Sequence, residues 1–177
     1  MLTISDVPVV PGRPARGIRM QVVGLLGFLG LSMAAWTIAS IPIMLNSTGW
    51  FATSAKAPWT PPGWMFRTMW MFLYAAMAVS AWLVWCRYAL QGSTRFWYVA
   101  HLMFNAAWPL AFFGLHPLIG TAALWIALAV LTGLCVSVGF LVVRFGPVSN
   151  SAGLLVLPYL SWVIYSLSLN LYSALNN

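Results

Sequence analysis

Charged side chains are almost absent from this chain, and this scarcity restricts the possible folds more than any other feature. Only 5% of the 177 residues are Asp, Glu, Lys or Arg, whereas 62% are hydrophobic. A soluble domain has about 25% charged residues, because water must solvate its surface. This chain lacks the groups for such a surface, so we expect a lipid bilayer to surround it.

The apolar residues fall into five long segments. The first, from about residue 20 to 45, would be roughly 39 Å long as an α-helix, enough to cross a bilayer with some tilt. It is also too long for the apolar core of a secretory signal peptide, which has about 7–15 residues. We therefore predict an all-α fold, an integral membrane bundle of five transmembrane helices in residues 18–177, after a disordered basic tail at 1–17. The spans are expected at about 20–45, 62–88, 94–113, 118–143 and 152–175.

The positions of the basic residues predict the orientation of such a bundle. With five spans, six of the eight Lys and Arg residues fall on the side of the N-terminus, and only Lys56 and Arg67 fall on the other. The positive-inside rule then places the N-terminus of this multi-pass protein in the cytoplasm. The same scatter argues against nucleic-acid binding, which requires basic residues gathered on one face.

The second segment combines a rigid start with an aromatic face. Three prolines between residues 58 and 62 exclude interior helix there, and a helix is expected to start near Pro62. Phe66, Trp70 and Tyr74 then recur every four residues, which places them on one face. The face is large, flat and apolar, with one phenol.

The connection at 46–61 precedes this helix and is rich in aromatic residues. Trp50, Phe51 and Trp59 would be unfavourable in water. We expect them either to lie in the interfacial aromatic belt or to fold over the bundle as a lid.

Polar residues inside the third and fifth segments indicate a shared interior. His101, Asn105 and Trp108 share one helical face, and Trp162 and Ser166 share another. Polar groups within a membrane often mark function, but they also form structural hydrogen bonds between helices, and both readings stay open. The fourth segment, which is the plainest, is expected on the outside or against another subunit. Cys86 and Cys135 form no metal-binding pattern, so we expect no metal site.

These residues together resemble the TspO/translocator-protein family, also called the peripheral benzodiazepine receptor family. The resemblance covers about residues 20–175. It rests on aromatic, proline and amide positions in three segments: Trp50-Phe51, Lys56, Trp59, Pro61-Pro62, Trp64, Phe66, Trp70, Leu73-Tyr74, Trp82, Trp85, Asn105, Trp108, Phe112-Phe113-Gly114, Pro158-Tyr159, Trp162 and Leu169-Asn170.

The resemblance implies a five-helix bundle, commonly a homodimer, that binds porphyrins and isoquinoline-type drugs under the first loop. Protoporphyrin IX or haem would be a ligand, and no cofactor would be obligatory. Lys56 or Arg67 could pair with a porphyrin propionate. The expected ligand-binding residues are Trp50, Trp59, Phe66, Trp70, Tyr74, His101, Asn105, Trp108, Trp162, Tyr165, Ser166 and Leu169.

Some positions depart from the family pattern. His101 stands where bacterial members often carry Gln, so binding could depend on pH, and Tyr165 stands where Ala is common, which would narrow the pocket. No basic residue follows Tyr172, so we expect no strong cholesterol motif of the animal type.

Three other functions remain open at this stage. Some relatives promote light-dependent breakdown of bound porphyrin, a reaction that would involve tryptophans. Conventional acid–base hydrolysis is disfavoured because no span holds a carboxylate, and the single acid, Asp6, lies in the tail. A transporter would require an ionisable group within the membrane, and His101 is the main candidate. A purely structural partner protein is the third alternative.

Overall fold

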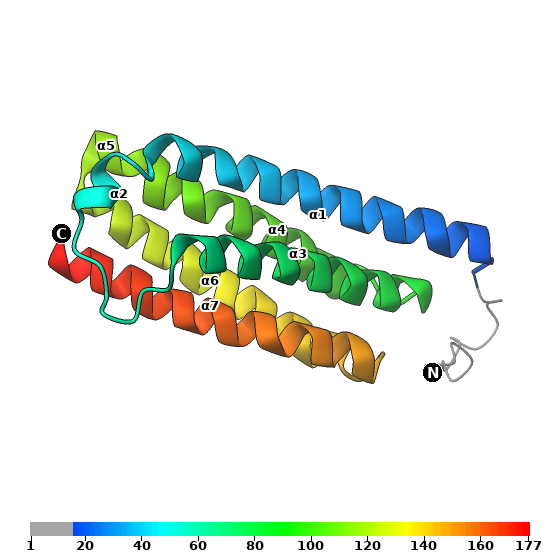
Figure 1. Cartoon of the computed structure of the whole chain (residues 1–177). Coiled ribbons are helices and arrows are strands. Elements are labelled where there is room, and N and C mark those ends of the chain that lie inside the picture. Colours follow the sequence, from blue (N-terminus) through cyan, green and yellow to red (C-terminus); the bar gives the residue numbers. More distant parts are fainter. Residues whose placement is uncertain (1–15) are drawn as a thin grey trace.

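A computed structural model describes residues 16–177, and all regular secondary structure in this range is helical (Figure 1). The predicted tail at 1–17 lies outside the described residues except for Arg16 and Gly17. The all-α prediction is confirmed. The helices are α1 (Ile18–Asn46), α2 (Trp50–Thr53), α3 (Gly63–Cys86), α4 (Gly92–Pro109), the π-helix η1 (Leu110–Leu115), α5 (His116–Ile119), α6 (Thr121–Phe145) and α7 (Asn150–Asn176).

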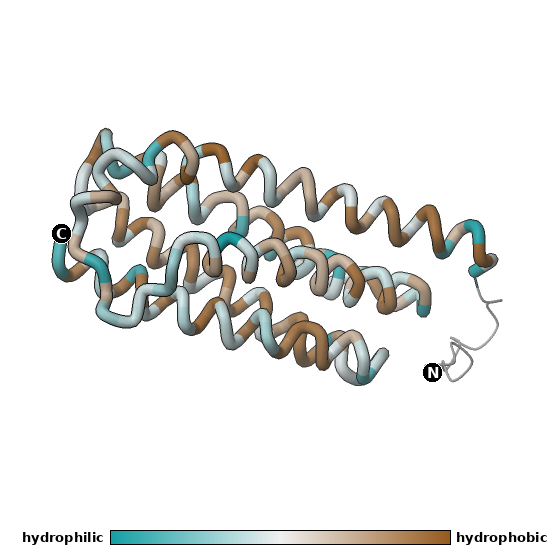
Figure 2. The backbone as a smooth tube through the Cα atoms, viewed as in Figure 1, coloured by the Kyte–Doolittle hydropathy of each residue, from teal (hydrophilic) through white to brown (hydrophobic). Residues whose placement is uncertain are grey.

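Five helical stretches are long and apolar enough to cross a membrane, as predicted. They are α1, α3, the continuous run from α4 to α5, α6 and α7. Figure 2 shows hydrophobic residues along these rods, with most hydrophilic positions near their ends. Each backbone N–H and C=O within a helix is bonded locally, which is what a bilayer requires of a spanning segment.

The five spans form a closed ring. Each packs mainly against two others, in the order α1, α3, α7, α6, α4 and back to α1, with a smaller contact between α3 and α6. The start of α1 and the end of α7 lie at opposite ends of the bundle, and the short helices α2 and α5 lie at the end where α7 finishes (Figure 1). Side chains that face the middle of this ring can therefore contact residues of several helices.

The third span continues further than the sequence predicts. We expected it to end near Phe113, with a turn at 114–117, but the chain stays helical to Ile119. Pro109 lacks an N–H and its ring blocks regular α-helical bonding, and the helix widens to η1 directly after it. The helix ends instead at Gly120, whose φ of 60° suits a residue without Cβ.

The outermost helix is α1 and not the fourth span. Only three residues of α1 are buried, whereas α6 has nine. Small residues such as Ala123 and Ala127, both 0% exposed, let neighbouring helices approach α6 closely. Of the two expected positions for the plainest span, the outside of the bundle is therefore wrong, because small aliphatic residues favour close packing as well as contact with lipid. Its contact with another subunit stays a prediction.

The turn between α6 and α7 has no room for an added methyl group. A Cβ on Gly153 would lie 2.8 Å from the Cα of Gly146, which belongs to the backbone and cannot swing aside. We therefore expect Gly153→Ala to destabilise the bundle by about 1–3 kcal/mol. Gly139→Ala is the matched control, since a Cβ there meets nothing within 4 Å. Thermal unfolding in detergent measures both, and equal midpoints would contradict the predicted crowding.

Candidate functional site

A cavity of about 270 Å³ lies at the end of the bundle near α2, beneath the connection between α1 and α3 (residues 47–62). We call it the large cavity. Residues from α1, the connection, α3, α4, η1 and α7 line it, so it opens inside the ring of spans. Its lining residues are Ile43, Ser47, Phe51, Lys56, Thr60, Pro61, Gly63, Phe66, Arg67, Trp108, Phe112, Phe113, Ser166, Leu169, Asn170 and Ser173.

The wall of the large cavity is mostly apolar, with a few polar groups. Ser166 is only 1% exposed, and its hydroxyl has no hydrogen-bond partner among the described residues. An unpaired buried hydroxyl is costly, so this group is available to a ligand. An apolar wall with a few free polar groups is typical of small-molecule sites.

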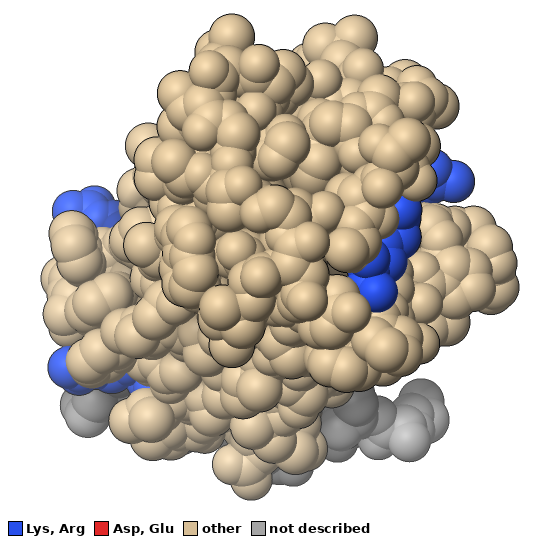
Figure 3. All heavy atoms as spheres, turned by 90° about the vertical axis from the view of Figure 1, so that its left-hand side faces the viewer, with Lys and Arg blue, Asp and Glu red and all other residues tan. Residues whose placement is uncertain are grey.

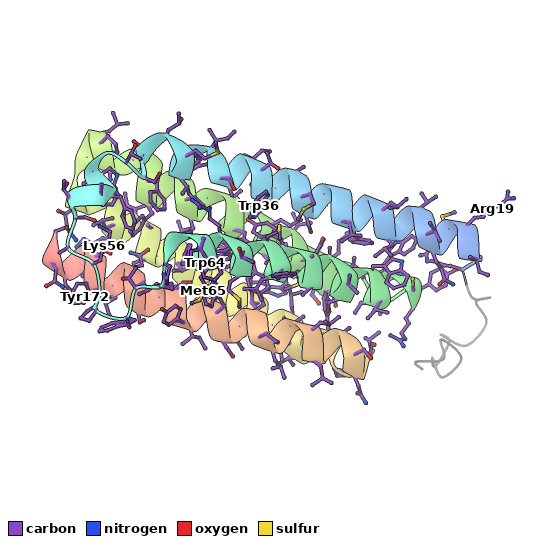
Figure 4. All side chains as sticks on the ribbon, in the orientation of Figure 1. Arg19, Trp36, Lys56, Trp64, Met65 and Tyr172 are labelled. Carbon is purple, nitrogen blue, oxygen red and sulfur yellow. The ribbon has the colours of Figure 1, made fainter. Side chains whose placement is uncertain are left out.

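Two cations mark the side where the large cavity meets the surface. Lys56 and Arg67 both line it and both are exposed. Lys56 already donates to the carbonyls of Ala52, at 3.1 Å, and Ser54, at 3.3 Å (labelled Lys56 in Figure 4). Figure 3, which faces this end, shows basic atoms in a few separate groups and no acidic atoms among the described residues. The cavity mouth therefore carries two basic side chains, and no described residue brings a carboxylate side chain to it.

A much smaller cavity lies between α1, α3 and α4. Its volume of about 30 Å³ is close to that of one water molecule. Trp70, Tyr74 and Asn105 line it, while Phe66 and Trp108 line both cavities. The Trp70 indole N–H and the Tyr74 hydroxyl are buried without a partner in the described part of the chain. Trp70, Tyr74 and Asn105 therefore lie in a floor below the large cavity, and Phe66 and Trp108 lie at the boundary between the two.

The floor is built from stacked rings. The rings of Trp70 and Trp108 lie 5.9 Å apart and nearly parallel, at 22°. Phe66 lies 6.2 Å from Trp108 and 5.8 Å from Trp162, so it joins α3 to both α4 and α7. Such aromatic contacts each contribute about 0.5–1.5 kcal/mol beyond area burial. The floor is therefore rigid, and a flat ligand could stack on its upper side.

His101 lines neither cavity. Its Nε2 lies 3.0 Å from the Tyr159 hydroxyl, and its Nδ1 lies 3.3 Å from the Tyr98 carbonyl. Asn105 also donates to the Tyr159 hydroxyl. A neutral imidazole satisfies both contacts when Nδ1–H donates to Tyr98 and Nε2 accepts from Tyr159. These bonds join α4 to α7, so the geometry favours the structural reading of His101 and gives no support to its use in transport.

A second set of hydrogen bonds fixes the position of Trp108 along the bundle axis. Its indole N–H donates to Asn170 Oδ1 at 2.9 Å, and Asn170 Nδ2 donates to the Leu124 carbonyl at 2.9 Å. The chain of contacts runs from α4 through α7 to α6. It keeps Trp108 at the boundary between the two cavities.

One half of the connection is held by ring stacking. Trp50, in α2, stacks on His116 with a centroid separation of 3.5 Å and an angle of 15°. It also contacts Phe112 and Phe113, at 5.6 and 6.3 Å. Trp50 therefore covers the end of η1 and α5 without lining either cavity.

The other half of the connection is tied to α7 by hydrogen bonds. Tyr165 donates to the Trp59 carbonyl at 2.6 Å, and the Trp59 indole donates to Ser168 at 3.1 Å. The Asn177 side chain pairs with the backbone of Ala55, accepting at 2.7 Å and donating at 3.1 Å. Trp59 also packs its ring against Tyr172, with 5.6 Å between the ring centres; Tyr172 is labelled in Figure 4. We call the connection (residues 47–62) the cover, because these contacts fasten it to α7 above the large cavity.

The predicted site residues divide into five groups. Phe66, Arg67 and Trp108 line both cavities; Lys56, Ser166 and Leu169 line the large one; and Trp70, Tyr74 and Asn105 line the small one. Trp50, Trp59 and Tyr165 hold the cover, while His101 and Trp162 pack behind the floor.

Sequence reasoning missed part of the large cavity's wall. Ser173 follows Ser166 by seven residues, two turns along the same face of α7, and this spacing would have revealed it. Ile43 lies in the last turns of α1, where no apolar periodicity distinguishes one face, and Ser47 directly follows that helix. The other residues missed are Phe51, Thr60, Pro61, Gly63, Phe112, Phe113 and Asn170.

Comparison with known proteins agrees with this architecture. The profile of the TspO/MBR family matches residues 24–175. The chain belongs to the TspO/MBR family. It is 30% identical over 143 residues to the tryptophan-rich sensory protein of Cereibacter sphaeroides, covering 81% of this chain and 86% of that protein. It is 30% identical over 158 residues to the tryptophan-rich protein TspO of Chlorobaculum tepidum, covering 85% and 93%. It is 32% identical over 127 residues to the translocator protein of Ovis aries, covering 68% and 70%.

The hydrogen bond from Tyr165 to the cover makes a direct prediction. Tyr165→Phe removes this bond but keeps the ring, which packs 5.2 Å from Trp162. Because a hydrogen bond contributes about 0.5–1.5 kcal/mol, amide exchange in residues 54–60 should become about two- to tenfold faster. Hydrogen–deuterium exchange with mass spectrometry measures this.

Tyr172→Phe is the matched control. It keeps the ring contact with Trp59, and the Tyr172 hydroxyl makes no hydrogen bond to any described residue. If both variants exchange like the unmodified protein in residues 54–60, the bond does not hold the cover.

Proposed function

We propose that this TspO/MBR-family protein is a membrane receptor that binds porphyrin-like and other flat apolar ligands in the large cavity. The observation that carries the proposal is an apolar cavity of about 270 Å³ between a floor of stacked rings and a fastened cover. A flat conjugated ligand gains the most from such a shape, because its faces can stack while its edges meet few polar groups.

The charge pattern of the cavity supports an amphipathic ligand. The interior is apolar, and Lys56 and Arg67 lie where it meets the surface. A ligand with a flat ring and carboxylate groups at one edge, as a porphyrin has, would place its ring inside and its carboxylates at these cations. Arg67 would be the better partner, since its guanidinium forms paired bonds to a carboxylate.

The size of the cavity sets a condition on binding. Ligand sites usually have volumes of about 300–1,000 Å³, and this cavity is slightly smaller. A whole porphyrin would therefore extend through the mouth or displace the cover. The cover is the part that can move, because hydrogen bonds and ring contacts at its surface hold it, whereas the floor is buried.

A cavity-filling substitution tests the proposal. Ser166→Phe places a ring in the large cavity. We expect the dissociation constant for protoporphyrin to rise about tenfold or more, since overpacking costs about 1–3 kcal/mol. Quenching of tryptophan fluorescence by added protoporphyrin measures the affinity.

Ser161→Phe is the control for this experiment. Ser161 lies on the same helix but is exposed, and its hydroxyl bonds only to the Leu157 carbonyl of its own helix. The Ser161→Phe variant should bind protoporphyrin as the unmodified protein does. Equal affinities for the two variants, or no quenching by any form at micromolar ligand, would reject the large cavity as the site.

We further propose that the N-terminus lies in the cytoplasm and the covered end of the bundle lies on the opposite side. The bias of basic residues toward the N-terminal side supports this orientation. In a bacterial host, alkaline phosphatase fused to the C-terminus should be active, and green fluorescent protein fused to the N-terminus should fluoresce. The reverse pattern would place the cover in the cytoplasm.

A further inference from the structure

The end of the bundle opposite the cover gathers several arginines, and no carboxylate side chain among the described residues pairs with them. At this end α1 begins, α3 ends and α6 ends (Figure 1). Arg16, Arg19, Arg87, Arg95 and Arg144 all lie there. The only acidic residue of the chain, Asp6, lies outside the described residues, so no carboxylate side chain in residues 16–177 can neutralise them.

Arg87 is the least satisfied of these residues. It follows the last turn of α3 and is half-buried. Its Nε and Nη1 atoms are shielded from solvent and have no hydrogen-bond partner within residues 16–177. A guanidinium has five N–H donors and no acceptor, and leaving charged donors buried and unpaired is costly. An anion at this position would accept those bonds and lower that cost.

Arg16 is held beside the same turn. Its guanidinium carbon lies 3.9 Å from the centre of the Trp85 ring and 4.0 Å from that of Tyr88. Its Nε donates to the Trp85 carbonyl at 3.3 Å, the only hydrogen bond that its side chain makes to a described residue. The two rings and this bond fix the guanidinium and leave its terminal amino groups available. Arg19, in contrast, points away from the bundle (Figure 4).

The position of these arginines decides which anion they meet. They lie at the ends of membrane spans, beside aromatic residues of the kind that sits at the lipid headgroup level. Phosphate groups are the abundant anions at this depth, and a guanidinium binds phosphate through paired, charge-assisted hydrogen bonds. Anionic phospholipids add a net negative charge that zwitterionic lipids lack.

We propose that the junction between the start of α1 and the end of α3 binds the headgroup phosphate of an anionic phospholipid, with Arg87 as the main ligand and Arg16 as the second. This site lies at the end of the bundle opposite the large cavity, and it needs no porphyrin. It explains why a guanidinium can be shielded from water in a region without carboxylates.

The test measures thermal unfolding of the full chain in detergent while phosphatidylglycerol is added. Phosphatidylcholine with the same acyl chains and sodium phosphate are the two parallel arms. We expect the unfolding midpoint to rise with phosphatidylglycerol alone. Arg87→Gln should raise the apparent dissociation constant about tenfold, as expected for loss of charge-assisted bonds, and Arg16→Gln should have a smaller effect in the same direction.

Arg19→Gln and Arg144→Gln are the matched controls. Both residues are exposed at the same end, so each variant loses one charge without losing a shielded guanidinium. Their apparent dissociation constants should stay within about twofold of the unmodified value, because single surface charges contribute little. Equal weakening in all four variants would show diffuse attraction to a basic surface and overturn the proposal.

The remaining outcomes are also decisive. Equal stabilisation by phosphatidylcholine would overturn the proposal, and stabilisation by sodium phosphate alone would replace the lipid with a free anion. Arg87→Lys keeps the charge but loses the forked geometry, so its affinity should lie between those of Arg87→Gln and the unmodified protein. Protoporphyrin quenching should be unchanged in Arg87→Gln, which separates this site from the proposed receptor function and shows that the variant is folded.

Discussion

Polar side chains inside the ring must find their hydrogen-bond partners within the protein, because lipid offers none, and this constraint fixes how the spans are arranged. The Tyr159 hydroxyl contacts both His101 and Asn105, which joins α7 to α4. Asn170 accepts from Trp108 and donates to the Leu124 carbonyl, which joins α7 to both α4 and α6. A sliding or rotated helix would leave several of these groups unpaired at once. The cost of an unpaired buried group therefore specifies the register of three helices.

The large cavity lies at the end of the bundle where this hydrogen-bond network ends. Below Trp108 the stacked rings fill most of the ring of spans, and the Trp70 indole N–H and the Tyr74 hydroxyl are enclosed there without a partner among the described residues. Above it, Ser166 keeps an unpaired hydroxyl, and the wall passes to α1 and the connection, neither of which is deeply buried. Hydrogen bonds at the surface hold the cover, whereas ring packing inside the bundle holds the floor. The same molecule thus combines a floor packed inside the bundle with a cover held mainly by contacts at the surface.

The sequence predicts much of this arrangement, and each limit of the prediction has a physical reason. Five apolar segments and the repeat of Phe66, Trp70 and Tyr74 predict the spans and the aromatic face, since hydrophobicity and periodicity are local properties. The extension of the third span to Ile119 was not predicted, because proline in a helix can be followed by a break or by a π-turn. Local spacing cannot decide between the two outcomes.

Tertiary pairing explains the other differences. His101 shares a face with Asn105, as predicted, but its partner Tyr159 comes from a helix more than fifty residues away, and only the fold shows that this pairing turns the ring away from the cavity. The sequence also did not predict that Ile43 and Ser47 line the large cavity. The helix α1 is apolar on every side, so packing against its neighbours decides which side of α1, and of the residue that follows it, faces the cavity. The bond between Asn177 and Ala55 links positions 122 residues apart and leaves no trace in local composition.

The two ends of the bundle show how a chain with one acidic residue distributes its charge. At the covered end, Lys56 folds back onto backbone carbonyls, so part of its charge is satisfied by dipoles of the protein itself. At the other end, Arg16 lies over two aromatic rings and Arg87 is shielded with free donors, so rings and an external anion must do what carboxylates do in soluble proteins. Positive charge at the end of a span is usually read only as a signal for orientation. Here the shielding of Arg87 gives it a second consequence: the headgroup layer becomes part of the hydrogen bonding that stabilises the fold.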